Sequence, residues 1–134
     1  MGSPKRIDNE AEYRRCVALM AQDGAEALIV GDLPETIRNR RLVVRLAEEN
    51  RLPAIYPFRE FVAVGGLMAY GPDLTDPGRH AAHQIDLILR GTKPGDIPFY
   101  QPTTIKLTIS LKSAKTLGIE MPTSLLVGAD EVIE

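Results

Sequence analysis

The chain has 134 residues, which is the length of a single domain. Hydrophobic residues make up 44% of it and charged residues 25%, and these globular values exclude a disordered tail, a collagen-like repeat and a coiled-coil rod. A net charge of −2 and an aromatic content of 5% argue against a nucleic-acid partner, which would need a basic surface or stacked rings. Cys16 is the single cysteine, so no internal disulfide can form.

No apolar run approaches the roughly 18 residues that span a bilayer, so we predict no membrane insertion. The N-terminus lacks the apolar stretch of a signal peptide, and we expect residues 1–9 to be a tail or tag.

The first part of the chain alternates helical and extended patterns. Apolar residues at helical spacing predict a first helix of about 15 residues that begins near Asn9 and stops at Gly24. Residues 27–30 form a short apolar run typical of a buried strand. Pro34 suits the first turn of a second helix, which we expect over residues 35–50. A second strand over residues 53–57 completes a strand–helix–strand unit, which predicts parallel pairing and a right-handed crossover.

The remainder continues the alternation. The expected elements are a helical turn at 58–64, a strand at 67–70, a helix from Asp76 to Gly91, a proline-rich connector at 91–104, a strand at 105–111, a short helix at 113–117 and a tail to Glu134. Residues 105–111 alternate strictly between apolar and polar types, which predicts a strand with one solvent-exposed face. The pattern as a whole predicts an α/β three-layer sandwich with a mainly parallel sheet.

Side chains that suit ligand binding follow several of the predicted strands. In parallel α/β sheets, ligands bind outside the carboxyl ends of the strands. Those ends carry Asp32, then Tyr56, Phe58 and Arg59, then Tyr70. One carboxylate, two phenols, a phenyl ring and a guanidinium would suit a small polar solute with an amine or carboxylate group. The alternative is that Tyr56 and Phe58 are core residues.

Two further clusters carry less specific signals. His80 and His83 are three residues apart, a spacing that suits a metal ion, but no third ligand is evident and we favour surface or boundary histidines over a metal site. Four arginines crowd the second helix, at positions 38, 40, 41 and 45. They could form a phosphate-binding face, although neighbouring glutamates favour ordinary ion pairing along the helix. No catalytic, metal-binding or cofactor-binding motif is present, and we predict no catalytic residue, metal or cofactor.

Several strings resemble a known family. They are RLPAIYPFREFVAVGGLMAYGPD at 51–73, GAEALIV at 24–30, ILRGTKPGDIP at 88–98, LKSAKTLGI at 111–119, PTSLL at 122–126 and ADEVIE at 129–134. In their order along the chain, these strings resemble the solute-binding proteins of ABC importers, in the type I-like periplasmic group related to tryptophan and branched-chain amino acid binders. The likeness extends over residues 10–134.

The resemblance implies a clamshell of two α/β lobes with the ligand between them, in proteins about twice this length. The chain would then be a truncated, C-terminal part. Residues 10–57 and 105–134 would belong to the second lobe, and residues 65–90 would return to the first lobe. Relatives place an aspartate after the strand that ends near Val30, and Asp32 is its counterpart here. They place a second aspartate after the next strand, where this chain has Tyr56, Pro57 and Phe58.

From these observations we predict a non-enzymatic, substrate-binding component of an ABC-type importer. Asp32, Tyr56, Phe58 and Tyr70 would bind an amino-acid-like or other small polar solute by lobe closure. The resemblance implies an ABC permease as partner and a periplasmic location. The alternatives are a truncated α/β remnant that binds nothing alone, and a small α/β enzyme or receiver-like domain. The apolar stripe of the helix at 76–91 should fold back onto the chain's own sheet or pair with a second copy, and of these we expect a homodimer.

Overall fold

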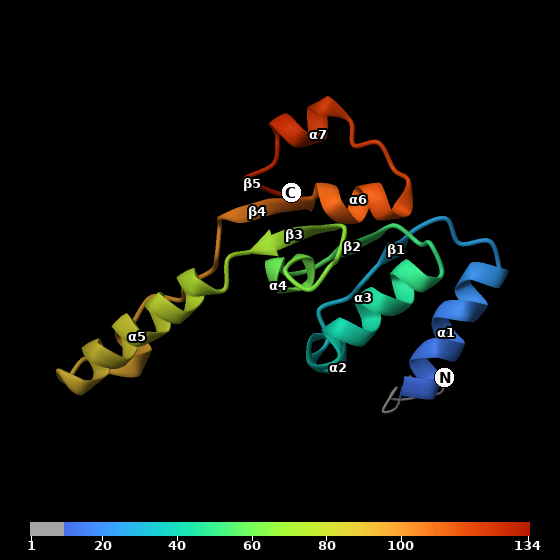
Figure 1. Ribbon diagram of the computed structural model, residues 1–134. Helices are drawn as coiled ribbons and strands as arrows, with labels where there is room; N and C mark the ends of the chain where they lie inside the picture. The colour runs from blue at the N-terminus through green and yellow to red at the C-terminus, as the bar shows by residue number, and fades with distance from the viewer. Residues whose placement is uncertain (1–9) are drawn as a thin grey trace.

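The computed structural model describes residues 10–134, and the tail or tag expected at residues 1–9 lies outside this range. The elements, in chain order, are α1 (Glu10–Gln22), β1 (Leu28–Ile29), α2 (Pro34–Arg38), α3 (Arg40–Glu49), β2 (Ala54–Tyr56), α4 (Arg59–Val62), β3 (Met68–Pro72), α5 (Thr75–Leu89), the 3-10 turn η1 (Pro94–Asp96), β4 (Ile105–Ser110), α6 (Leu111–Leu117), α7 (Thr123–Val127) and β5 (Glu131–Ile133). The alternation of strands and helices confirms the predicted α/β class (Figure 1).

The five strands form one mixed sheet in the order β1-β2-β3-β4-β5. Strands β1, β2 and β3 are parallel, β4 is antiparallel to β3, and β5 is parallel to β4. Right-handed crossovers place α3 and α4 on one face, where α1 packs on α3. Because β4 and β5 run the opposite way, the same rule places α6 and α7 on the other face (Figure 1). The helices therefore cover both faces of the sheet, as in a three-layer sandwich.

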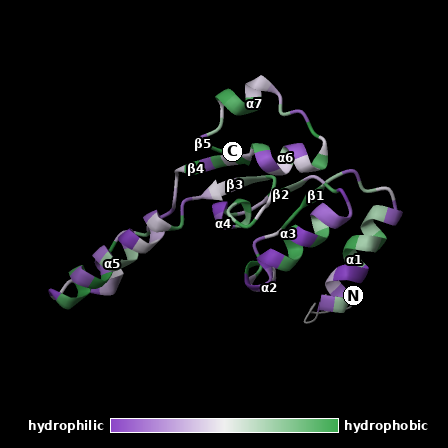
Figure 2. Cartoon of the chain, in the orientation of Figure 1, coloured by the Kyte–Doolittle hydropathy of each residue, from purple (hydrophilic) through white to green (hydrophobic). Residues whose placement is uncertain are grey.

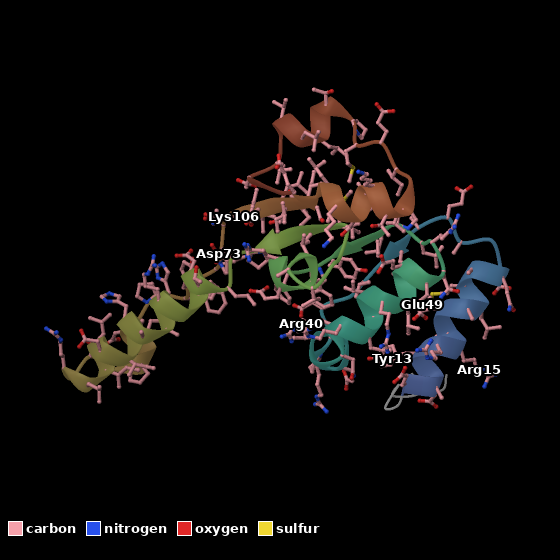
Figure 3. The ribbon with its side chains drawn as sticks, in the orientation of Figure 1. Tyr13, Arg15, Arg40, Glu49, Asp73 and Lys106 are labelled. Carbon is pink, nitrogen blue, oxygen red and sulfur yellow. The ribbon has the colours of Figure 1, made fainter. Side chains whose placement is uncertain are left out.

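The core lies between the sheet and the helices α1, α3 and α4. Its most deeply buried side chains include Leu46 of α3 and Phe61 of α4, while Ile109 of β4 is fully buried in the middle of the sheet. The ring of Tyr56 stacks on that of Phe61 with their centroids 5.0 Å apart. Arg14 of α1 donates to both Glu10 and Glu49 and so ties α1 to α3; Figure 3 labels Glu49 on α3.

The helix predicted over residues 35–50 is two helices that meet at Asn39. The side-chain nitrogen of Asn39 donates to the backbone oxygen of Glu35 at 2.9 Å, a local bond that competes with helix continuation. Pro34 opens α2 as predicted. The predicted strand–helix–strand unit and its parallel pairing are confirmed by the pairing of β1 with β2.

The prediction for the C-terminal part was wrong in two respects. Strand β4 does not have one exposed face, because Thr108, Ile109 and Ser110 are all buried while its first residues are exposed. Exposure changes along the strand because its far end lies between helices on both faces. The expected tail instead contains α7 and the edge strand β5, whose residues pair with Thr108–Ser110 of β4.

Residues 73–104, which we call the arm, extend away from the sheet (Figure 1). The helix α5 has no buried residue and does not fold back on the sheet. The connector returns along it, with the ring of Tyr100 stacked on that of His80 and its hydroxyl donating to Asp76. Strand β3 pairs with β2 and β4, so within residues 65–90 the chain leaves the sheet only after Pro72.

Candidate functional site

The carboxyl ends of β1, β2 and β3 meet at the edge of the sheet from which the arm emerges (Figure 1). Because β4 is antiparallel to β3, its first residues lie at this same edge, with Gly71 opposite Lys106. The edge is tightly built, since a Cβ added to Gly71 would stand 1.8 Å from the backbone oxygen of Pro57. Only a residue without a side chain allows β3 to approach the end of β2 so closely.

A cavity of about 400 Å³ lies at this edge, beside the first turn of α4 and along the ends of β3, β4 and β5. The charged side chains that line it are Arg59, Glu60, Asp73, Lys106, Asp130 and Glu131. Both signs of charge are therefore present in one hollow. Such a lining suits a small solute that carries an ammonium and a carboxylate group.

A bidentate ion pair at the cavity joins Arg59 to Glu131. The Arg59 Nε and Nη2 atoms each lie 2.6 Å from a carboxylate oxygen of Glu131, which is a bidentate pair. This hydrogen bonding holds the pKa of the Glu131 carboxyl below its usual value. The side chains of both residues stay partly exposed, so the pair is screened by solvent and could yield to a ligand at modest cost.

A second pair, between Lys106 and Asp73, lies where the arm leaves the sheet (Figure 3). The Lys106 Nζ stands 2.8 Å from an Asp73 carboxylate oxygen, and the other oxygen accepts from the backbone and hydroxyl of Thr75. The hydrogen bond from Lys106 is the main reason that the pKa of Asp73 lies well below its usual value. Asp73 therefore connects β4 to the first turn of α5.

The four residues predicted to bind solute occupy two different environments. Tyr56 and Phe58 are only 3% and 7% exposed and belong to the core, as the alternative interpretation expected. Burial raises the pKa of the Tyr56 hydroxyl. Tyr70 is 59% exposed on β3, and Asp32 is exposed after β1. None of the four lines the cavity.

Sequence reasoning had placed Arg59 at a strand end without including it in the predicted set, and it missed Asp73, Lys106 and Glu131. The position of Asp73 directly after a strand was an available signal. Lys106 could have been found only by placing β4 antiparallel at the same edge, and Glu131 only by recognising β5.

Other functional groups are sparse. Within residues 10–134, no three His, Cys, Asp or Glu side chains are grouped so as to hold a metal ion. Across the same residues, no helix has the length and apolar character needed to cross a bilayer.

Comparisons with solved structures reveal close structural similarity. A tryptophan-bound ABC domain from Streptococcus pneumoniae matches with a TM-score of 0.83 and 29% identity, over 95% of this chain and 44% of that one. A conserved domain protein from Vibrio cholerae O1 biovar El Tor also gives a TM-score of 0.83, at 19% identity, over 92% of this chain and 42% of that one. A ligand-free, open substrate binding protein with adhesive properties from Clostridium difficile gives a TM-score of 0.64 at 20% identity, over 95% of this chain and 42% of that one.

The chain thus spans less than half the length of these structures, and the two with lower identity support the fold alone. No curated protein sequence matches the chain significantly. The family model described as ABC transporter substrate binding protein matches residues 4–133. Since this match extends over nearly every residue and the fold agrees with it, the chain belongs to the family of ABC transporter substrate binding proteins.

Proposed function

We propose that this chain is the C-terminal part of the substrate-binding component of an ABC-type importer, and that it binds a small amino-acid-like solute. The observation that carries the proposal is the 29% identity to the tryptophan-bound ABC domain over 95% of this chain. The charged cavity at the carboxyl edge of the sheet supports an amino-acid-like ligand, because it offers both cationic and anionic side chains.

In the proposed site, the solute lies across the carboxyl edge and contacts the exposed side chains of Asp32 and Tyr70. Asp32 would accept a hydrogen bond from the solute's ammonium group. Tyr56 and Phe58 would support the site from below, since both are buried at the end of β2. Arg59 at the cavity is the cation best placed to exchange its present carboxylate partner for that of the solute.

The proposed mechanism is lobe closure followed by docking on a membrane permease, outside the cytoplasmic membrane. The arm supports it, because α5 leaves the sheet at the cavity and has no buried residue. We assign residues 10–57 and 105–134 to one lobe, with α5 belonging to the other. The protein would bind its solute without transforming it and without a cofactor.

Where α5 is not covered by the other lobe, we also propose that copies of this chain form a homodimer through their arms. Leu89 of α5 is 81% exposed and Phe99 of the connector is 92% exposed, and Ile85 and Ile88 lie on the same helix. Burying such side chains is worth on the order of several kcal/mol at about 25 cal/mol per Å². Light scattering should give twice the monomer mass at micromolar concentration, and a mass that stays at 14.7 kDa would contradict the dimer.

Calorimetric titration with tryptophan and other amino acids tests the binding function. Asp32→Ala should weaken an amine-bearing solute by about 1.5–3 kcal/mol, the worth of a charge-assisted hydrogen bond. Asp23→Ala is the matched control, because Asp23 is an exposed aspartate that follows α1 rather than a strand. If neither this chain nor a longer version with a complete first lobe binds any amino acid, the alternative of a remnant without ligand binding gains support.

A further inference from the structure

The arginines of α2 and α3 divide into two groups in the structure. Arg45 pairs with Glu10 and with Glu49, at 3.1 and 3.8 Å, as ordinary pairing on the helix surface would require. Arg38, Arg40 and Arg41 form no ion pair with any carboxylate of residues 10–134. Glutamate pairing therefore accounts for one of the four arginines and leaves three positive charges uncompensated at the junction of the two helices.

These three side chains line a common hollow. It measures about 280 Å³ and is lined by Arg38, Asn39, Arg40, Arg41 and Leu42 (Figure 3 labels Arg40). The break at Asn39 creates it, because the chain turns from α2 into α3 there instead of continuing as one helix. The hollow lies at the start of α3, apart from the charged cavity beside β3 and β4, with which it shares no lining residue.

Arg40 carries a hydrogen-bond donor that has no acceptor. Its Nη1 donates to the backbone oxygen of Ile37 at 3.3 Å, while its Nε is buried and has no partner within the described part of the chain. A buried donor left without an acceptor is costly and uncommon in native proteins. Because this Nε is buried, an anion in the hollow would bind the outer nitrogens of the guanidinium, of which Nη2 makes no hydrogen bond within residues 10–134.

The end of α3 that faces the hollow is itself electropositive. Its first turn contains no acidic residue, and Asn39 caps it without a side-chain hydrogen bond. Arg40 and Arg41 occupy the first two positions, where the helix dipole disfavours cations unless an anion is near. The helix end and the three guanidinium groups thus favour the same kind of ligand.

We propose that this hollow is an anion site that binds a phosphate group. A doubly charged tetrahedral anion balances three cations better than a single carboxylate does, and planar guanidinium groups donate to its oxygens in pairs. Arg40 is half-buried and supplies the fixed donors, whereas the exposed Arg38 and Arg41 enclose the anion from outside. The site is independent of the proposed solute site and of the transport function.

Titration of the full chain with inorganic phosphate, followed by NMR of the arginine Nε–H groups, tests the site. We expect saturable shifts at Arg40 and in the backbone of residues 38–42. Arg40→Gln and, as a second variant at an exposed position, Arg38→Gln should each weaken phosphate about tenfold, the equivalent of one charge-assisted bond. Arg45→Gln is the matched control on the same helix and should change the affinity less than about twofold, because Arg45 is already paired.

Three outcomes decide the matter. Saturable binding of free phosphate that is lost in Arg40→Gln supports a soluble phosphate. Binding only to vesicles that contain phosphatidylglycerol, lost in Arg40→Gln and kept in Arg45→Gln, assigns the phosphate group to a lipid headgroup. If the chain binds neither free phosphate nor these vesicles, the proposal is overturned. Equal losses of affinity in Arg40→Gln and Arg45→Gln also overturn it, since they would reflect general charge attraction alone.

Discussion

Replacing Gly71 with alanine tests whether the close approach of β2 and β3 shapes the edge of the sheet that carries the charged cavity. The new Cβ would stand 1.8 Å from the backbone oxygen of Pro57. Carbon and oxygen atoms that are not bonded rarely approach closer than about 3.3 Å, so the strand ends must separate by about 1.5 Å. Overpacking of this kind, with strained pairing between β2 and β3, should lower the free energy of unfolding by about 3 kcal/mol.

Urea unfolding followed by circular dichroism measures this loss, with Gly78→Ala as the matched control. Gly78 lies in α5 with open space around the position of a Cβ, so alanine there should raise helix stability by up to about 1 kcal/mol. The two substitutions add the same methyl group and should act with opposite signs. A loss below about 0.5 kcal/mol for Gly71→Ala would refute the reasoning, because the backbone would then tolerate the intrusion.

Three further predictions concern the ion pairs and the arm. A double-mutant cycle with Lys106→Met and Asp73→Asn should reveal a favourable coupling at neutral pH and low salt that declines as salt screens it, and a coupling unchanged at 1 M salt would contradict an exposed pair. Arg59 lowers the pKa of Glu131 below its unfolded value of about 4.3, so the stabilisation is complete above about pH 5 and is lost as the pH falls. Melting temperatures of the wild type and Glu131→Gln should therefore converge in acid. Tyr100→Phe removes the hydroxyl bond to α5 and should speed hydrogen exchange of α5 amides without affecting the amides of the sheet.

The sequence indicated most of the fold because the relevant signals were local. Short apolar runs marked β1 and β2, and Pro34 marked the start of a helix. The prediction that the run at 27–30 is a buried strand was wrong, because β1 is an edge strand and Ile29 is 89% exposed. What the sequence missed depended on tertiary context. Asn39 breaks the helix through a side-chain bond to the backbone, and alternation along residues 105–111 could not reveal that helices cover both faces of β4. Strand β5 has three residues, too few for a periodic pattern, and forms by pairing with β4.

The site was less accessible to sequence reasoning than the fold. In parallel α/β sheets, the strand order predicts the edge at which ligands bind. The sequence placed Arg59 at this edge, and Arg59 lines the cavity there. Aromatic residues at strand ends, however, serve the core and a ligand equally well, and Tyr56 and Phe58 are core residues. Lys106 lies 33 residues after Asp73 and Glu131 lies 72 residues after Arg59, and only the sheet order brings each pair together.

The geometry at the base of the arm connects solute binding to movement in the proposed function. Two strands join the arm to the sheet, and they are in register there, with Pro72 opposite Ile105. Asp73 directly follows Pro72 and Lys106 directly follows Ile105, so their ion pair connects the same two strands. Both side chains line the cavity. Any rotation of α5 relative to the sheet must therefore change the backbone angles beside this ion pair. A solute that bound either charged group would compete with the pair, and so it would alter the very contact that fixes the direction of the arm.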